Sequence, residues 1–401
     1  MLARSMPVTS MKAKADSIGD LPPYYEIQNH QRVRFASAVP VSQSESASPM
    51  TSVRARTLDP LTDSAWDDLV ARHPRSSVFH QRGWLEALAQ TYGYRPVAFT
   101  TSPPNGVLKN GLLFCQINSW LTGSRLVSLP FSDHCDPLCD SPDEMISLAD
   151  GCQALLDEER RQYIEVRPTD EDLGRTCSKA GFQPVGHYFL HVLDLSPNLE
   201  TLFQSFDKDS VQRRIRRAER ASLIEKCGTS PELLQDFYRL FVITRGRHHL
   251  PPPPFAWFQN LVQCQGNTLE IRVAYHNGSA IAAILTLRFR EIGYFKYGCS
   301  DARFNKFGAT PWLLWRAIAA AKGSGALAFD LGRTQQDNAG LLAFKDHWAR
   351  NHQRLVYWRF PGGPSRDGSD GWKLKIAKRV FSCMPKRLLA ASGKLIYRHI
   401  G

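Results

Sequence analysis

Apolar and polar positions become periodic after residue 60 and predict helices and strands in a regular order. Two helices are expected first, over 63–74 ("DSAWDDLVARHP") after a capping aspartate, and over 77–93, ended by Gly93. Strand-like runs follow at "RPVAFTT", "LLFCQINSW" and "SRLVSLPF". A helix, "DEMISLADGCQALLDEERR", and two strands, "QYIEVRP" and "YFLHVLDLS", complete the first half.

The second half repeats this order. The helices "SPELLQDFYRLFVITRGRHH" and "FAWFQNLVQC" precede the strands "LEIRVAYHNG", "SAIAAILTLRFR" and "EIGYFKYGCS". The helix "TPWLLWRAIAAAKG", with Thr310 as the expected N-cap and Gly323 as its end, and the strand "LAFDLG" follow. We therefore predict an α/β (α+β) protein in which one architecture is used twice, each unit a mixed, mainly antiparallel sheet flanked by helices.

The ends of the chain differ from this pattern. Residues 1–50 are rich in Ser, Ala and Pro and predict a disordered arm, with a transit peptide as the alternative. The repeated units are expected over 51–197 and 198–360. Residues 361–401 form a basic tail in which "GWKLKIAKRVFSCM" predicts an amphipathic helix. Such a helix could lie on an anionic membrane surface or dock on the core.

Composition narrows the class of protein. The 401 residues are 43% hydrophobic, enough for two packed domains, and Lys plus Arg exceed Asp plus Glu by 50 to 38. The excess of 12 predicts anionic partners such as phosphates, nucleic acid or acidic lipid. No apolar run is long enough to span a bilayer, and the nine cysteines form no disulfide pattern. We expect a cytoplasmic protein, or one held peripherally at the inner membrane face.

A stripe of arginines is the first candidate for binding. In "SVQRRIRRAERAS" (210–222), helical spacing places Val211, Ile215 and Ala218 on one face. The other face carries Arg213, Arg216, Arg217 and Arg220. It is either a solvated basic face or a surface whose repulsion is relieved by a bound phosphate or nucleic-acid backbone.

The stretch "FDLGRTQQDNAGLLAFKDHW" (329–348) is the second candidate. Asp330 is expected to end a strand, and Arg333 to follow at its edge. In a helix over 339–348, Lys345 falls on the apolar stripe of Leu341, Phe344 and Trp348. Lys345 either snorkels to water or is a desolvated ammonium beside Asp330 and Arg333 in a site.

The loop "SLPFSDHCDPL" in the first half is the third candidate, with Asp133 and His134 at its centre. Cys135 and Cys139 have no second pair of ligands at metal-binding spacing. We therefore expect a loop that lines a cleft, and no metal.

Several of these stretches resemble the FemAB-like branch of the GNAT acyltransferases, including the BioF2-like or CelD-like acetyltransferases. The resemblance rests on "SVFHQRGWLEAL", "SLPFSDH", "RRIRRAER", "YFKYGCSDARFNKFGATPWLLW", "FDLGRT" and "GLLAFKDHW", within 55–360. It implies two tandem GNAT-like domains. It further implies transfer of an acyl or aminoacyl group to an amine, as in enzymes that use aminoacyl-tRNA for peptidoglycan cross-bridges or act in exopolysaccharide production.

The resemblance assigns roles to residues. The catalytic residues expected are Lys345, Asp330 and Arg333. Lys345 would stabilise the oxyanion of a tetrahedral intermediate or hold the donor's phosphates, and Asp330 or the substrate itself would handle the amine's proton. The substrate-binding residues expected are Arg213, Arg216, Arg217, Arg220, Tyr297, Asn305, Phe344, Asp133 and His134. In "RFNKFGA", Lys306 replaces the first glycine of the pyrophosphate loop of acyl-CoA enzymes.

We therefore predict an N-acyltransferase without a tightly bound cofactor. Acyl-CoA or aminoacyl-tRNA is the expected donor, and the acceptor is an amine on a sugar or peptide precursor of the cell envelope or of an exopolysaccharide. The alternatives are a nucleic-acid-binding module that uses Arg213 to Arg220, and an inactive GNAT-fold protein.

Overall fold

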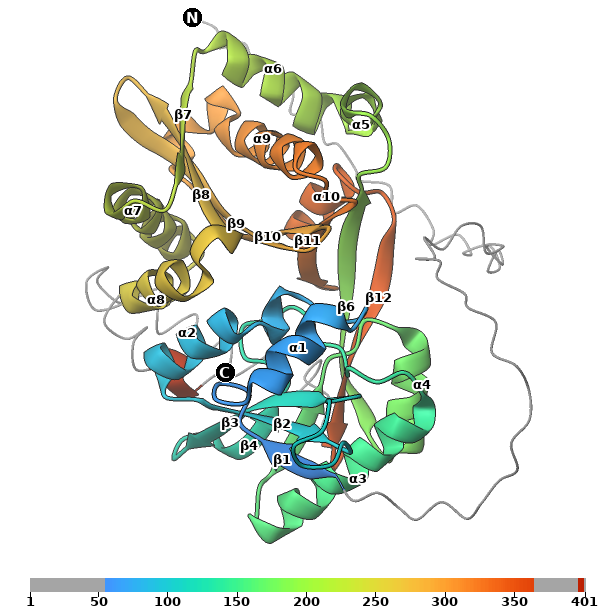
Figure 1. Cartoon of the computed structure of the whole chain (residues 1–401). Helices are drawn as coiled ribbons and strands as arrows, with labels where there is room; N and C mark the ends of the chain where they lie inside the picture. Colours follow the sequence, from blue (N-terminus) through green and yellow to red (C-terminus); the bar gives the residue numbers. More distant parts are fainter. Residues whose placement is uncertain (1–54, 364–395, 400–401) are drawn as a thin grey trace, which may run out of the picture. The chain divides into compact units, whose positions relative to one another are not determined.

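One sheet of twelve strands runs through both halves of the chain (Figure 1). The computed structural model describes residues 55–363 and 396–399. The strand order is β1-β2-β3-β4-β5-β12-β6-β11-β10-β9-β8-β7. Neighbouring strands are antiparallel except for β4 with β5 and β10 with β11, which are parallel. These two parallel pairs occupy the same place in each half.

The first half contains a short strand, two helices, a three-strand meander, a helix, a strand, a short helix and a long strand. Its helices are α1 (Ser64–Arg72), α2 (Arg82–Tyr92), α3 (Pro142–Glu158) and α4 (Glu171–Lys179). Its strands are β1 (Arg56–Leu58), β2 (Arg95–Thr100), β3 (Leu112–Ser119), β4 (Gly123–Val127), β5 (Tyr163–Val166) and β6 (Gln183–Asp194).

The second half repeats this order after α5 (Leu199–Ser205) and α6 (Arg213–Arg220). Its other helices are α7 (Pro231–Arg247), α8 (Phe255–Gln265), α9 (Ala309–Gly323) and α10 (Ala339–Asp346). Its strands are β7 (Ile224–Gly228), β8 (Leu269–His276), β9 (Ser279–Phe289), β10 (Ile292–Ser300), β11 (Ala328–Gln335) and β12 (His352–Phe360). The predicted repeat of helices and strands is confirmed.

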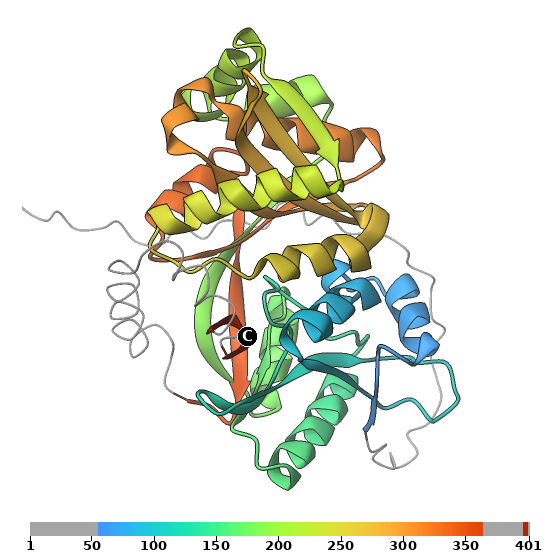
Figure 2. The same ribbon diagram turned by 90° about the vertical axis from the view of Figure 1, so that its left-hand side faces the viewer.

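Helices cover both faces of the sheet, which explains the continuous apolar runs of its strands. In β9, Ala283 and Leu285 pack with α7 and α8, whereas Ala282 and Ile284 pack with α6 and α9. Figures 1 and 2 show these two helix layers on opposite sides of the second-half strands. A strand that is buried on both faces needs apolar residues at successive positions. This is why the strand sequences here show no alternation of polar and apolar residues.

The last strand of each half inserts into the sheet of the other half. β12 pairs with β5 through Trp358–Phe360, and β6 pairs with β11 through Tyr188–Asp194. β6 and β12 also pair with each other and run side by side in Figure 1. The helices join the halves as well, because Trp84 of α2 meets Trp257 of α8 with 5.4 Å between ring centroids.

The structure corrects several predicted elements. The helix predicted over 77–93 is a short 3-10 turn, Val78–His80, followed by α2, although Gly93 does end it in the left-handed conformation. Gly308, not Thr310, is the N-cap of α9. The sequence pattern missed β1, α4, α5, β7 and β12.

Some predictions fall outside the described residues. The arm at 1–50 and the helix expected at 371–384 are among them, and the boundary at 197/198 stays a prediction. Residues 396–399 are described and contact the first half, where Ser119 Oγ lies 2.9 Å from Nδ1 of His399. Among the described residues, none of the helices has the length and apolar character that crossing a membrane requires.

Candidate active site

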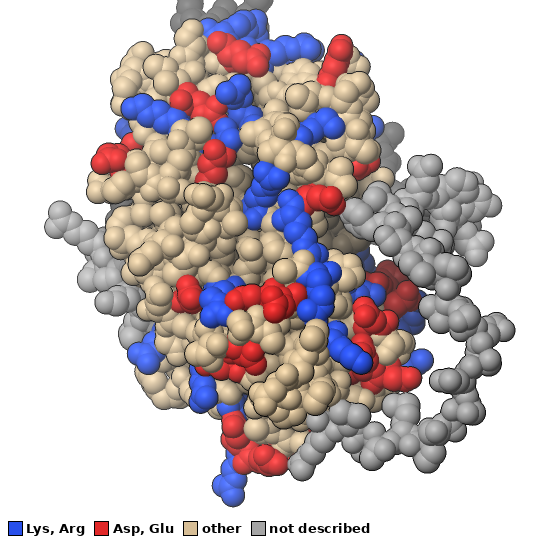
Figure 3. Space-filling model, in the orientation of Figure 1, with Lys and Arg blue, Asp and Glu red and all other residues tan. Residues whose placement is uncertain are grey.

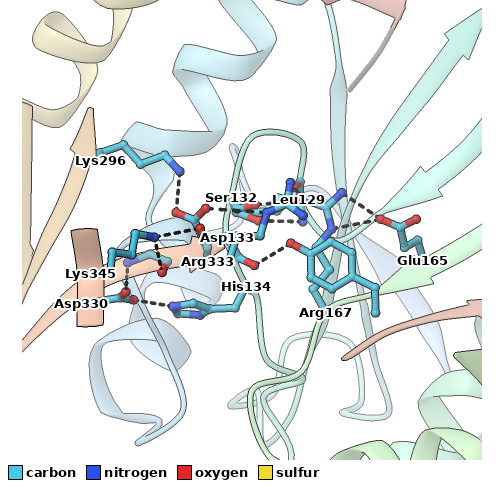
Figure 4. Close-up of polar contacts among 12 residues, drawn as sticks. Leu129, Ser132, Asp133, His134, Glu165, Arg167, Lys296, Asp330, Arg333 and Lys345 are labelled. Atoms are coloured by element: carbon cyan, nitrogen blue, oxygen red, sulfur yellow. Dashed lines mark hydrogen bonds and ion pairs between the residues drawn. The ribbon is translucent and has the colours of Figure 1, made fainter. Parts of the chain in front are cut away.

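The strands β10 and β11 separate after a short parallel pairing, and the space between them is filled from the first half. They pair only from Ile292 to Tyr294 with Ala328 to Asp330. A bulge then shifts the register of β10 between Phe295 and Tyr297, at Lys296. The loop after β4 brings Asp133 and His134 to this place (Figure 4).

We call the group of polar side chains here the junction cluster. It comprises Asp133, His134, Tyr188, Lys296, Asp330, Arg333, Lys345 and Tyr357. Five of the predicted site residues are therefore neighbours, although they come from opposite halves of the chain.

Asp133 is the carboxylate at the centre of the cluster. Lys296 Nζ lies 2.8 Å from its Oδ2, and Arg333 Nε lies 3.9 Å from its Oδ1. Burial opposes the ionisation of Asp133, but the charges of Lys296 and Arg333 outweigh it and lower the pKa to about 2. Asp133 is thus an ionised carboxylate at neutral pH.

Gly332 lets β11 pass close to Asp133. The strand does not end at Asp330 as predicted; it continues to Gln335 with a register shift against β6 between Asp330 and Arg333. Gly332 has φ of 76°, and a Cβ there would lie 3.2 Å from Asp133 Oδ2. Glycine is required here both by the left-handed backbone and by the close approach.

Lys345 points into the protein and does not snorkel. Only 3% of it is exposed, and its Nζ donates to the carbonyl oxygens of Gly332 at 2.7 Å and Arg333 at 2.8 Å. Burial lowers the pKa of Lys345 to about 8, against the opposing effect of Asp133 and Asp330. The predicted apolar stripe is wrong for Leu341, which is exposed; Phe344 is half-buried against Trp348.

His134 and Asp330 form a buried pair. His134 Nε2 lies 2.8 Å from Asp330 Oδ2, and the backbone N–H of Gly332 donates to Asp330 Oδ1 at 2.6 Å. Burial opposes protonation of His134, but the bond to Asp330 and its charge raise the pKa above its ordinary value. His134 Nδ1 is buried without a partner. The ring therefore has one nitrogen that bonds to none of the described residues.

Among the cations of the junction cluster, Arg333 is the one that reaches the surface, with 32% of its side chain exposed. Its guanidinium lies 4.4 Å from the ring centre of Tyr188 and 5.1 Å from that of Tyr357. Tyr357 also donates to the backbone oxygen of Asp133 at 2.7 Å. Both tyrosines stand on the exchanged strands β6 and β12, so this site needs both halves of the chain.

The corresponding place in the first half is closed by ion pairs. Glu165 on β5 faces Val127 of β4 as Asp330 on β11 faces Tyr294 of β10. Glu165 is buried, with Arg167 at 2.8 Å (Figure 4) and Arg359 at 2.9 Å. Arg167 also donates to the carbonyl oxygen of Ser132 at 3.2 Å. The first-half residues therefore support the loop that carries Asp133.

The arginine stripe lies apart from the junction cluster, on α6. Val211, Ile215 and Ala218 are buried as predicted, and Arg213, Arg216, Arg217 and Arg220 are exposed. Figure 3 shows Lys and Arg side chains at the end of the molecule where Figure 1 places α6. Arg213 pairs with Asp209, and Arg217 donates to the carbonyl oxygen of Lys306 at 3.2 Å. Their role as binding residues stays a prediction.

Tyr297 and Asn305 do not reach the cluster with their polar groups. The hydroxyl of Tyr297 accepts from Trp257 Nε1 at 3.0 Å, and its ring packs among aromatic side chains. Asn305 is exposed in a 3-10 turn, Ala302–Phe307, which precedes α9. A Cβ on Gly308, which follows this turn, would overlap the carbonyl oxygen of Arg214.

Sequence reasoning missed Lys296, Tyr188 and Tyr357. Lys296 carried a signal, since it is a charged residue within the apolar strand "YFKYG". Tyr357 lies on β12, which the pattern had not identified. Tyr188 stands on a predicted strand, but only the pairing of β6 with β11 and β12 brings it to Arg333.

Comparison with known proteins is consistent with this architecture. Residues 207–346 match the family model of the acetyltransferase (GNAT) domain. The solved structure of FemX aligns with a TM-score of 0.61 at 14% identity, covering 76% of this chain and 97% of FemX. L-PGS from Bacillus licheniformis aligns with a TM-score of 0.52 at 14% identity, covering 82% of this chain and 97% of L-PGS. A search of curated proteins finds no match.

The class of domain follows from this match. Residues 207–346, in the second half of the chain, form an acetyltransferase (GNAT) domain. The chain shares the fold of FemX, and the predicted fold, in which one mixed, mainly antiparallel architecture is used twice, is confirmed.

Proposed function

We propose that the chain transfers an acyl group to an amine at the junction cluster. The observation that carries this proposal is the convergence of Lys296, Arg333 and Lys345 around the ionised Asp133, where β10 and β11 of the GNAT domain separate. Positive charge in a water-poor place stabilises negative charge that develops only in the transition state.

Each residue of the cluster has a role in this reaction. Asp133 and Arg333, which are partly exposed, meet the substrates first, and Asp133 holds the acceptor's amine. The amine nitrogen bonds to the acyl carbon, and the carbonyl oxygen becomes an oxyanion that faces Arg333 and Lys345. His134, oriented by Asp330, takes the proton that the amine loses. The intermediate then expels the donor's leaving group as the carbonyl reforms.

The donor is an acyl-CoA or an aminoacyl-tRNA, and two observations favour the tRNA. The start of α9 departs from a pyrophosphate loop, because Lys306 replaces a glycine and the backbone of α6 packs on Gly308. The exposed arginines of α6 lie beside that loop, where they could contact a phosphate backbone.

We infer that the acceptor is an amine on a sugar or peptide precursor of the cell envelope or of an exopolysaccharide. This inference rests on the sequence resemblance to the FemAB-like and BioF2-like proteins. Peripheral contact of the basic tail with the inner membrane face belongs to the same proposal, and the residues concerned lie outside those described.

The experiment is a transfer assay with the full chain. A panel of acyl-CoAs and aminoacyl-tRNAs is offered with amine acceptors, and products are identified by mass spectrometry. Arg333→Ala should lower turnover at least about a hundredfold, as for other oxyanion-stabilising groups. Lys179→Ala, an exposed lysine on α4, is the matched control. The proposal fails if no donor is consumed, or if Arg333→Ala transfers as fast as the parent chain.

A nucleic-acid-binding module is the second candidate, favoured by the exposed stripe on α6. In that case Arg213→Ala or Arg217→Ala should weaken binding to RNA and reduce the slope of log K against log salt by about one unit. Arg333→Ala would then leave the affinity unchanged. A transfer activity that survives both stripe variants would count against this candidate.

A further inference from the structure

Three ligand atoms converge where β6, α10 and β12 meet. His191 on β6 is fully buried, and its Nε2 lies 2.9 Å from Oδ1 of Asp346 at the end of α10. Nδ1 of His352, the first residue of β12, lies 3.3 Å from the same oxygen. His352 faces His191 directly across the β6–β12 pair. The backbone therefore places these side chains together by register.

We propose that His191, Asp346 and His352 bind a divalent transition-metal ion, with Zn²⁺ as the expected occupant. Imidazole nitrogens and a carboxylate oxygen are ligands that Zn²⁺ accepts, and bonds of about 2.0–2.2 Å place neighbouring ligand atoms roughly 3–3.5 Å apart. The three atoms all lie within 4.8 Å of one another. Small rotations of the side chains would complete the site, and the sequence-based expectation of no metal would be overturned.

Burial gives the site one closed and one open side. The side chain of His191 is inaccessible, whereas Asp346 and His352 are 37% and 30% exposed. An ion can enter from the exposed side and keep water in its remaining coordination positions, as zinc sites with three protein ligands do.

The contacts of His191 direct Nε2 toward the site. Its Nδ1 is buried without a partner, so the ring's polar contact is made through Nε2 toward Asp346. Nδ1 is therefore free to carry the ring proton when Nε2 serves as a ligand. One oxygen of Asp346 faces two imidazole nitrogens. A cation between these three atoms would bind all of them and replace the hydrogen bonds.

A bound ion would tie the end of α10 to the two exchanged strands. Lys345 precedes Asp346 on that helix and holds the carbonyl oxygens of Gly332 and Arg333. The ion would thus hold α10, which supports the junction cluster, in place without itself being part of that cluster. Because a ligand of the native state stabilises it by mass action, the ion should raise the melting temperature. This inference does not depend on acyl transfer.

The test is metal binding by the full chain after removal of metals with a chelator. Titration with Zn²⁺ followed by calorimetry should show one ion per chain, and Co²⁺ should give the visible absorption of a nitrogen- and oxygen-ligated site. Asp346→Asn and His352→Ala should each weaken binding at least about tenfold. His187→Ala is the matched control, since His187 lies on the same strand and contacts Arg354 instead.

Several outcomes would overturn the proposal. They are the absence of Zn²⁺ binding by the parent chain, undiminished binding by His352→Ala, or equal loss in His187→Ala. A thiolate-to-cobalt charge-transfer band would place the ion on a cysteine, such as the exposed Cys227. Circular dichroism of each variant separates the loss of a ligand from the loss of the fold.

Discussion

At the scale of single residues, the site is defined by charges that are held in place by backbone atoms. Lys345 donates two of its three N–H groups to the carbonyl oxygens of Gly332 and Arg333. It therefore supports the backbone that presents Arg333, and its charge adds to that of Arg333 and Lys296. The residue is both a structural support and a source of positive potential.

Lys345→Met should show whether Lys345 contributes to transfer as well as to stability. The substitution keeps the apolar stem but leaves two buried carbonyl oxygens without a donor, which should cost about 1–3 kcal/mol of the free energy of unfolding. Chemical denaturation measures that loss. Under conditions where the variant remains folded, its transfer rate should still fall well below that of the parent chain. Equal rates would show that Lys345 has only a structural role.

Asp133 should make stability depend on pH in acid. Its folded pKa of about 2 lies below the ordinary value of 3.8, so ionised Asp133 stabilises the fold fully above about pH 4. That contribution, on the order of 2 kcal/mol, should be lost as the pH falls from 4 through 2. Asp133→Asn should remove this part of the dependence, as measured by denaturation at a series of pH values. An identical profile for both proteins would contradict the ion pair.

At the scale of elements, the register shift in β11 is the feature that assembles the site. Successive side chains of a regular strand point to opposite faces, so Asp330 and Arg333, three positions apart, would point to opposite faces without the extra residue between them. The shift presents Asp330 to His134 and Arg333 to Tyr188 and Tyr357. Gly332 makes that backbone path possible.

Gly332→Ala should therefore damage both stability and the position of Asp133. A residue with a Cβ at φ of 76° costs roughly 1–2 kcal/mol, and the new methyl group would press on Asp133. Gly340→Ala in α10 is the control with the opposite sign, because a Cβ there meets nothing within 4 Å and alanine favours a helix by up to about 1 kcal/mol. Denaturation midpoints measure both. Equal midpoints for the two variants would refute this account of the turn.

At the scale of the whole molecule, the exchange of β6 and β12 joins the two halves. Each half's sheet contains the last strand of the other, and Leu355 of β12 is buried beside Val185 and Tyr188 of β6. Neither half can lose its last strand without opening the sheet of the other.

The two halves should therefore unfold together. Far-ultraviolet dichroism and tryptophan fluorescence, with Trp66 and Trp84 in one half and Trp312 in the other, should give coincident transitions. Leu355→Ala should shift both signals equally, by about 2–5 kcal/mol in the free energy of unfolding. Two separated transitions would mean that the exchanged strands do not couple the halves.

The sequence by itself determined the repeat, most helices and the candidate residues Asp133, His134, Asp330, Arg333 and Lys345. Apolar periodicity, caps and turn residues act over a few positions, so their pattern is legible along the chain. Lys345 was noticeable because an ammonium stood among apolar neighbours. The resemblance to a known family supplied the chemistry.

Only the tertiary structure decided which of these residues meet. The strand exchange, the shift in β11 and the pairing of His134 with Asp330 across 196 positions of the chain depend on long-range contacts that leave no local period. β12 was missed because its strand conformation depends on its pairing with β5 and β6. Local preference places side chains on faces of elements, and packing of the whole chain then chooses which faces come together.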